Sequence, residues 1–457
     1  MRKKFLMMVA CGMLLTLSTG RAQTKSDGFK SLFDGKSLAG WHILGGKANY
    51  TIQDGAIVGE MQKGIANSFL ATEKKYGDFI LELDIKLEGT ETNSGVQFRS
   101  QFNPEGNKGE GLVYGTQVDI DPTPRAWSGG IYDEARRNWL YPLDLNEAAK
   151  KAYKIEQYNK VRIEAIGDEV RVWINDTPTA VLIDTLDKTG IIGLQVHAVA
   201  DHLAGKKVYF KDIRIKTENL AFTKLPTDVY VVNLKNNNLS EVEKKEGVSL
   251  LFNGVDAKQW RSIDGKEFPK KGWVVKDGEI RVLKSDGAES TNGRDIVTKK
   301  QYQAFDLSFD FKITEGANSG VKYFVTLKEE TKGSAIGLEY QILDDANHPD
   351  AKLGKSGNRT MASLYDLITS QKHPRAPRAI GEWNRGRIVV TADNQVTHYL
   401  NGIKMVSYKR GSAEFKALVA DSKYKDWPNF GEAVKGHILL QDHGDAVNFK
   451  NIKIKEL

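Results

Sequence analysis

Apolar and polar residues alternate with a period of two along many short stretches of this chain. The stretches Phe79–Leu87 (FILELDIKL) and Phe305–Ile313 (FDLSFDFKI) show the pattern clearly. Because neighbouring side chains on a β-strand point to opposite faces, this period predicts strands with one buried and one solvated face. Gly, Asn and Asp separate these stretches, and few stretches have helical periodicity. The pattern predicts an all-β protein built from antiparallel β-sandwiches.

The chain carries the same short motifs twice and in the same order, which indicates an internal duplication. The matched pairs are Leu32–Gly35 (LFDG) with Leu251–Gly254 (LFNG), Asn93–Val96 with Asn318–Val321 (both NSGV), Leu194–His197 (LQVH) with Leu440–His443 (LQDH), and Phe210–Lys216 (FKDIRIK) with Phe449–Lys455 (FKNIKIK). We therefore expect two tandem domains, 27–217 and 248–457, joined by a polar surface linker, 218–247. A copy of about two hundred residues suits a jelly roll of two curved sheets, which offers a concave face.

The first 22 residues have the pattern of a secretory signal peptide. Basic residues at positions 2–4 precede the apolar run Phe5–Leu17, which is too short to span a bilayer, and small residues precede a cleavage point at Gln23. The sequence thus predicts a periplasmic or secreted protein, with a lipoprotein anchored through Cys11 as the weaker alternative. Cys11 is the single cysteine, so the mature chain would have no thiol for disulfides, metal binding or nucleophilic catalysis.

Charge and hydropathy exclude two classes of partner. Removing residues 1–22, which contain four basic residues and no acidic one, lowers the formal net charge from +7 to +3. Basic and acidic residues then alternate along the chain, which argues against a nucleic-acid-binding surface. No later stretch is apolar enough to span a membrane. The sequence leaves the oligomeric state open.

Strand alternation in the first copy turns a set of polar side chains away from the core. Val96, Phe98, Val118 and Ile120 are expected inside, so their neighbours share the opposite, solvated face. The side chains placed there are Gln97, Arg99, Gln117, Asp119, Asp121, Gln195 and His197, and Asn93, just before the first of these strands, is a further candidate for substrate binding. The loop that follows adds Trp127, Tyr132, Glu134 and Arg137. Such a convergence of acids, amides, an imidazole and guanidinium groups is typical of an active site, although Asn93 alone would equally suit a turn.

The second copy repeats this plan with different charges. Its candidate residues are Asn318, Lys322, Glu339, Gln341, Tyr365, Gln441 and His443. Lys322 takes the place of Gln97, and Phe324 takes the place of Arg99. The order of the motifs aligns Glu339 with Gly115 of the first copy. These differences leave open whether both clefts perform the same chemistry.

The acidic residues of the first copy also suggest a cation. Asp119, Asp121 and Glu134 form a candidate site for a divalent cation such as calcium, because hard cations favour several carboxylate oxygens. The spacing does not decide between metal binding and catalysis, and no cofactor is implied with certainty.

In this order the motifs resemble the 3-keto-disaccharide hydrolase domain family, which has a concanavalin A-like jelly-roll fold. The resemblance rests on the LFDG and NSGV motifs, on Gln117–Pro122 (QVDIDP), on Gly130–Glu134 (GIYDE), and on Leu440–Gly444 (LQDHG), and it covers nearly the whole mature chain. It implies cleavage of glycosides that carry a ketone at C3. In that chemistry a base removes the acidified C2 proton, the enolate expels the C1 leaving group, and water adds to the enone.

Residue type and facing suggest hypotheses for the catalytic roles. In the first copy His197 or Asp119 is the candidate base, with Glu134 as a further acid and with Arg99, Arg137 or a cation as electrophile. In the second copy His443 or Glu339 is the candidate base and Lys322 the electrophile. Two alternatives remain open: a non-catalytic lectin-like module, with one copy or both only binding sugar, and hydrolysis of an ordinary glycoside by two carboxylates.

Overall fold

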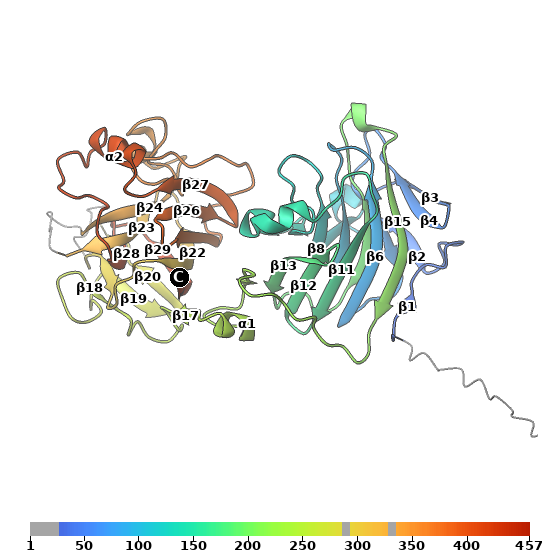
Figure 1. Ribbon diagram of the computed structural model, residues 1–457, viewed down its shortest axis with the longest axis horizontal. Helices are drawn as coiled ribbons and strands as arrows, with labels where there is room; N and C mark the ends of the chain where they lie inside the picture. The colour runs from blue at the N-terminus through green and yellow to red at the C-terminus, as the bar shows by residue number, and fades with distance from the viewer. Residues whose placement is uncertain (1–26, 286–292, 328–334) are drawn as a thin grey trace, which may run out of the picture.

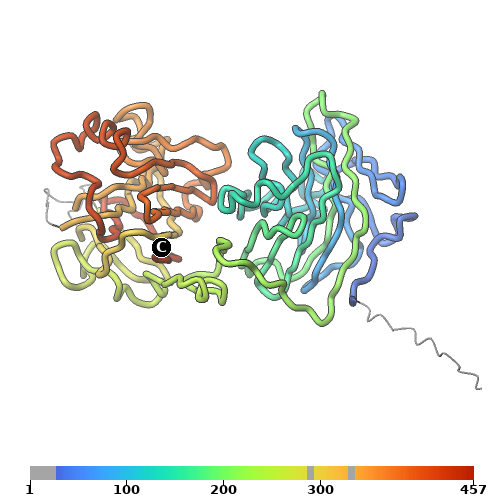
Figure 2. Tube along the Cα trace, in the orientation of Figure 1, coloured from blue at the N-terminus to red at the C-terminus, as the bar shows by residue number. Residues whose placement is uncertain are grey.

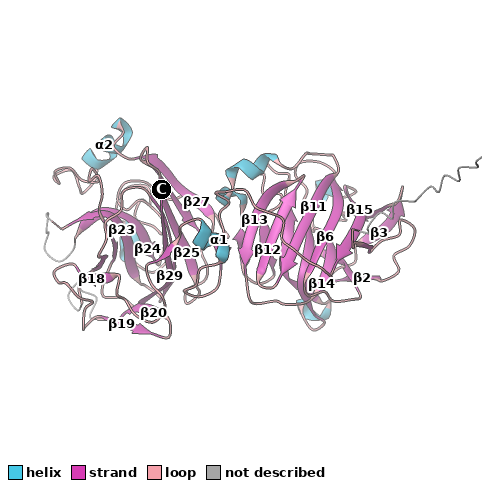
Figure 3. Ribbon diagram, turned by 60° about the horizontal axis from the view of Figure 1, so that its bottom comes forward, coloured by secondary structure: helices cyan, strands magenta, loops and turns pink. Residues whose placement is uncertain are grey.

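The computed structural model describes residues 27–285, 293–327 and 335–457. The chain forms two β-sandwich domains that lie side by side and are joined by a linker along one edge (Figures 1 and 2). Strands dominate both domains (Figure 3), so the prediction of two tandem jelly-roll β-sandwiches is confirmed. The predicted signal peptide, residues 1–22, lies outside the described residues. Within the described residues, no helix has the length and apolar character needed to cross a membrane.

The first domain consists of a nine-stranded and a seven-stranded sheet. The larger sheet has the order β16-β13-β12-β11-β6-β15-β4-β3, with β1 beside β15. Its strands are β1 (Lys30–Ser31), β3 (Asn49–Gln53), β4 (Ala56–Glu60), β6 (Phe79–Leu87), β11 (Asn159–Ile166), β12 (Glu169–Ile174), β13 (Thr177–Ile183), β15 (Lys207–Lys216) and β16 (Val232–Asn233). The smaller sheet has the order β10-β9-β8-β7-β14-β5-β2. Its strands are β2 (Trp41–Leu44), β5 (Ser68–Thr72), β7 (Ser94–Asn103), β8 (Leu112–Ile120), β9 (Ile131–Glu134), β10 (Asn138–Tyr141) and β14 (Ile191–Val196).

The second domain repeats this arrangement with an eight-stranded and a five-stranded sheet. The larger sheet has the order β19-β20-β29-β22-β25-β26-β27, with β17 beside β29. Its strands are β17 (Ser249–Leu250), β19 (Trp273–Lys276), β20 (Glu279–Val282), β22 (Phe305–Ile313), β25 (Asn384–Val390), β26 (Gln395–Leu400), β27 (Ile403–Lys409) and β29 (Val447–Glu456). The smaller sheet has the order β18-β21-β28-β23-β24, with strands β18 (Trp260–Ser262), β21 (Ile296–Thr298), β23 (Asn318–Thr326), β24 (Ile336–Leu343) and β28 (His437–Leu440). Two short helices, α1 (Glu241–Lys245) and α2 (Ala413–Ala420), complete the described elements of regular α-helix.

Strand alternation places the core of each sandwich as the sequence predicts. On β8 the side chains of Val118 and Ile120 are fully buried between the sheets. Gln117 and Asp119, which alternate with them, therefore lie on the opposite face of the same strand. This opposite face of the smaller sheet carries the first of the two polar clefts described below.

A β-bulge interrupts the alternation at the same place in both copies. The pairing of β7 with β8 shifts register between Gln97 and Gln101, and Arg99 adopts a left-handed backbone with φ of +49°. Phe324, at the equivalent position of β23, has φ of +54°. Because a bulge turns the following side chain to a new direction, Gln97 and Arg99 do not share one face. The expectation that they do was wrong.

The linker is more than a polar surface segment. Val232 and Asn233 form β16, which pairs in parallel with β13 and is buried. The helix α1 begins with a capping box, in which the side chains of Ser240 and Glu243 each accept a hydrogen bond from the other residue's backbone N–H. The buried carboxylate of Glu243 also pairs with Lys453 Nζ of β29 at 2.7 Å, which fastens the linker to the second domain.

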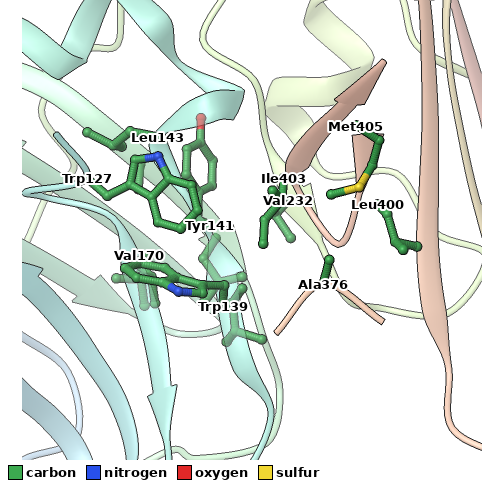
Figure 4. Close-up of a cluster of buried hydrophobic side chains, with 14 of the residues drawn as sticks. Trp127, Trp139, Tyr141, Leu143, Val170, Val232, Ala376, Leu400, Ile403 and Met405 are labelled. Atoms are coloured by element: carbon green, nitrogen blue, oxygen red, sulfur yellow. The ribbon is translucent and has the colours of Figure 1, made fainter. Parts of the chain in front are cut away.

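The two domains meet through an apolar contact with polar bonds around it. Figure 4 shows Tyr141 of the first domain and Ile403 of the second on either side of the domain boundary, with Val232 of the linker beside Ile403. Around this contact, Lys404 donates its backbone N–H to Asp144 (3.1 Å). These contacts hold the hairpin of β26 and β27 against the first domain.

Candidate functional site

The first polar cleft has a volume of about 400 Å³ and lies on the outer face of the smaller sheet of the first domain. The lining residues that carry the argument below are Asn67, Asn93, Gln117, Asp119, Asp121, Arg125, Tyr132, Glu134, Trp139, His197, His373 and Arg375. The structure thus brings together seven of the side chains predicted from strand alternation and the following loop. Five others, Asn67, Arg125, Trp139, His373 and Arg375, were not predicted.

Asp119 is a buried carboxylate at the base of this cleft. Its Oδ2 accepts a hydrogen bond from Asn93 Nδ2 and its Oδ1 accepts one from Gln117 Nε2, each at 3.1 Å. Burial raises the pKa of Asp119 to about 7, and the nearby charge of Asp121 adds to the rise. A carboxylate with this pKa exchanges a proton readily near neutral pH, which is the property required of a general base.

A row of amides behind Asp119 fixes its orientation. Gln97 Nε2 donates to Gln117 Oε1 at 3.0 Å, and Ser100 Oγ donates to Gln97 Oε1 at 2.5 Å. Gln117 Nε2 also lies 3.3 Å from Gln195 Oε1. Gln97 and Gln195 therefore support the site from behind and do not line the cleft. Such a network holds the carboxylate in one geometry.

Glu134 and His197 form the opposite wall of the cleft and are linked through Asn67. Asn67 Nδ2 donates to Glu134 Oε1 at 3.1 Å, and Asn67 Oδ1 accepts the backbone N–H of Ala198 at 2.8 Å. Burial raises the pKa of Glu134 and lowers the pKa of His197. His197 Nδ1 lies 2.5 Å from the carbonyl oxygen of Ala198, which accepts its proton and leaves the Nε2 lone pair available.

Besides Gln97 and Gln195, three more predicted residues lie outside the cleft. Arg99 is buried and donates to the carbonyls of Gly77 (2.7 Å) and Gly167, and to Asp78. Arg137 pairs with Asp133 and with Asp184 and lines a separate groove between the domains, with a volume of about 740 Å³. Trp127 is buried, packs edge-on against Trp139 at 4.8 Å between ring centroids, and donates its Nε1–H to Asp144. Arg99 and Arg137 therefore do not meet the geometric requirement for an electrophile of the first cleft, and Trp127 is no open sugar platform.

The three acids proposed as a calcium site do not gather around one point. Asp121 Oδ2 forms an ion pair with Arg125, and both oxygens of Asp119 accept amide hydrogen bonds. Within the described part of the chain, a different group, His348, His443 and Asp445, has potential ligand atoms all within 4.8 Å of one another. Its donor types suit a transition metal more than calcium.

The hydrogen bonds of this second group limit its use as a metal site. His348 Nδ1 accepts the backbone N–H of Asp350 at 3.1 Å, and Asp445 Oδ2 accepts the backbone N–H of Asn318 at 3.0 Å. The first bond places the imidazole proton on Nε2, so His348 has no free lone pair in this arrangement. Metal binding there would require the ring to give up this bond.

The second polar cleft has a volume of about 290 Å³ and lies at the equivalent place in the second domain. Its lining includes all seven residues predicted for it: Asn318, Lys322, Glu339, Gln341, Tyr365, Gln441 and His443. Lys322 Nζ lies 4.0 Å from Glu339 Oε2. Lys423, Tyr424 and Trp427 come from the segment between α2 and β28 and were not predicted. Lys423 Nζ lies 4.2 Å from the centre of the Tyr365 ring.

Strand pairing corrects the alignment of the two copies. Glu339 pairs with Lys322 as Gln117 pairs with Gln97, so Glu339 corresponds to Gln117 and not to Gly115. By the same register, Gln341 corresponds to Asp119. The carboxylate and the amide have therefore exchanged places between the two clefts.

The fold and the clefts define a jelly-roll protein with two sites suited to a small polar ligand. A family model described as the 3-keto-alpha-glucoside-1,2-lyase-like domain matches residues 28–216 and 247–455. A 3-keto-disaccharide hydrolase from Bacteroides thetaiotaomicron is 34% identical over 233 residues, which cover 46% of this chain and 79% of that protein. The chain belongs to the 3-keto-alpha-glucoside-1,2-lyase-like family, as its motifs predict, and contains two copies of the domain.

Two solved structures of similar chains come from Parabacteroides distasonis. A protein from Parabacteroides distasonis assigned as a glycosyl hydrolase is 36% identical, covers 49% of this chain and 100% of its own, and has a TM-score of 0.42. A second protein from the same organism, with the same assignment, is 27% identical, covers 43% of this chain and 99% of its own, and has a TM-score of 0.33.

Proposed function

We propose that this protein cleaves the glycosidic bond of 3-keto glycosides, such as a 3-keto disaccharide, in the cleft of its first domain. The observation that carries the proposal is Asp119, a buried carboxylate with a pKa of about 7, held by Asn93 and Gln117 in a cleft that also contains Glu134 and His197. A ketone at C3 makes the C2 proton acidic enough for such a base. Family membership supports the same substrate class.

The reaction begins when Asp119 removes the C2 proton and the electron pair becomes an enolate on the C3 oxygen. The enolate reforms the ketone and expels the C1 oxygen, which takes a proton from Glu134 and leaves as a free alcohol or sugar. Burial favours the protonated form of Glu134, as a general acid requires. The product of this step is an enone with a C1–C2 double bond.

Water then adds to the enone and restores both catalytic groups. The carboxylate of Glu134 takes a proton from water as the hydroxyl bonds to C1, and Asp119 returns a proton to C2. The sum of the steps is hydrolysis. His197, whose Nε2 lone pair is available, is the alternative base for the first step.

The test compares a 3-keto disaccharide with the same disaccharide in its unoxidised form. In a Glu339→Gln background, which silences the second cleft described below, we expect turnover of the keto substrate alone, and its loss in Asp119→Asn, which keeps the side chain's shape but cannot accept the proton. Cleavage of the unoxidised sugar would instead support the two-carboxylate scheme. Binding of either sugar without cleavage would support the lectin-like alternative. Full activity in Asp119→Asn with loss in His197→Ala would transfer the role of base to His197.

The second cleft takes the same class of sugar in this proposal, with Glu339 as its base and Lys322 as its electrophile. Their separation of 4.0 Å and their position in the cleft support these roles. Glu339→Gln separates the contribution of this cleft from that of the first. Export to the periplasm or beyond, proposed from the pattern of residues 1–22, would place both clefts where external saccharides arrive.

A further inference from the structure

The first cleft is built from both domains. Its lining includes His373, Pro374 and Arg375, which belong to the loop before β25 of the second domain. Arg375 Nη1 donates to the hydroxyl of Tyr132 at 3.3 Å, and its guanidinium lies 5.6 Å from the centre of the same ring. The second cleft differs in this respect, because its lining residues all lie between Asn318 and His443.

Several contacts fix this loop on the first domain. The ring of His373 lies 5.9 Å from the ring of Trp127, and Arg378 Nη2 donates to the carbonyl oxygen of Trp139 at 3.0 Å. His373 Nδ1 also accepts the backbone N–H of Arg375 at 3.2 Å, which orders the loop at the cleft. This bond places the proton of the neutral His373 ring on Nε2, where it serves as a donor.

The other arginine side chains near this cleft form ion pairs with carboxylates. Arg125 pairs with Asp121, Arg99 with Asp78, and Arg137 with Asp133 and Asp184. In the ranges that the structure describes, Arg375 forms no ion pair with a carboxylate, and its side chain is exposed to solvent at the cleft. An uncompensated guanidinium on the wall of a polar cleft is suited to a ligand oxygen that carries or develops negative charge.

The positive charge of Arg375 affects the pKa values of two candidate catalytic residues. The charge of Arg375 partly offsets the rise that burial causes in the pKa of Glu134. It also adds to the fall that burial causes in the pKa of His197. Arg375 is therefore electrostatically coupled to both residues on that wall.

We propose that Arg375 is the electrophile of the first cleft and binds the C3 oxygen of the substrate as that oxygen becomes an enolate. The first active site is thus complete only when the second domain is docked. This inference rests on the proposed function and adds a residue from the other copy of the duplication. Arg375 takes the role of electrophile, for which the sequence suggested Arg99, Arg137 or a cation.

The experiment measures turnover of a 3-keto disaccharide by the full chain in a Glu339→Gln background, which silences the second cleft. We expect Arg375→Ala to lower kcat by about 100-fold, with a smaller change in KM, because removal of one oxyanion donor typically costs about 100- to 1,000-fold. Arg375→Lys should lose less, because it keeps the charge. Added guanidinium ion should partly restore Arg375→Ala, a rescue that a purely structural role would not give.

Lys372→Ala is the matched control on the same loop. Lys372 pairs with Asp345 of its own domain at 2.9 Å and does not line the first cleft, so its removal should leave turnover unchanged. If Asp119→Asn is inactive while Arg375→Ala keeps full activity, the inference is wrong and the proposed function stands. If Asp119→Asn is itself fully active, the proposed function of this cleft fails first.

Discussion

Replacing Asp121 by Asn tests whether the charges of the first cleft set its pH dependence. The negative charge of Asp121 contributes to the raised pKa of Asp119, after burial, and the charge of Arg125 opposes it. Asp121→Asn removes the first charge and also frees Arg125 from its ion pair with Asp121. The loss of the Asp121 charge lowers the pKa of Asp119, and the opposing charge of Arg125 remains.

The size of the fall follows from Coulomb's law. Residues two apart on an extended strand are about 7 Å apart, and two unit charges at that distance interact by about 0.6 kcal/mol in water and by about 2.4 kcal/mol near a protein surface. Since one pKa unit corresponds to about 1.4 kcal/mol, we expect the pKa of Asp119 to fall by about one unit or more. A base is active when deprotonated, so the acidic limb of the kcat/KM profile should move from near pH 7 to about pH 6 or below.

The assay is the pH profile of kcat/KM for a 3-keto disaccharide at constant ionic strength, again in the Glu339→Gln background. Glu91→Gln is the control, because Glu91 lines the same cleft but its side chain is 72% exposed, so that water screens its charge. Its acidic limb should stay at the wild-type position. An unchanged or higher midpoint in Asp121→Asn, or an equal shift in Glu91→Gln, would refute the electrostatic reasoning.

Three further predictions concern stability and cation binding. The pKa of Asp119 is higher in the folded protein (about 7) than its ordinary value of 3.8, so the folded state binds this proton more tightly. The stability of the wild type relative to Asp119→Asn should therefore fall by up to about 4 kcal/mol between pH 4 and pH 7; urea denaturation that gives one constant difference would contradict this. Glu243→Gln should lower the free energy of unfolding by about 3 kcal/mol, because it leaves the buried Lys453 without its carboxylate; a thermal-denaturation loss below about 1 kcal/mol would show the pair to be solvated. Millimolar calcium should leave the melting temperature unchanged, because the oxygens of Asp119 and one oxygen of Asp121 already accept hydrogen bonds; a clear rise would show that these carboxylates rearrange around a cation.

The fold and one face of the first cleft were predictable from local pattern. The period-two alternation identified β8, and the full burial of Val118 and Ile120 leaves Gln117 and Asp119 on the opposite face. The repeated motifs likewise predicted two copies. These signals are carried by neighbouring residues along the chain, so a single sequence contains them.

Other features depend on contacts between distant segments. The left-handed backbone at Arg99 and Phe324 is formed by residues that rarely adopt it, and no glycine marks the bulge. This bulge removes Arg99 from the cleft. Strand pairing sets the register in which Glu339 corresponds to Gln117. The spacing of the motifs along the chain had instead aligned Glu339 with Gly115.

No local pattern in the sequence predicted that Arg375 lines the first cleft. It arises from the docking of the second domain against the first, through contacts such as Lys404 with Asp144 and Arg378 with Trp139. Neither motif order nor strand alternation within one copy contains that information.

Single-turnover cleavage of a 3-keto disaccharide labelled with deuterium at C2, measured in the Glu339→Gln background, tests most directly whether Asp119 abstracts the C2 proton. Proton abstraction predicts that the labelled substrate reacts several-fold more slowly than the unlabelled one, and that Asp119→Asn abolishes both reactions. Equal rates for the two substrates, together with full activity in Asp119→Asn, would contradict it.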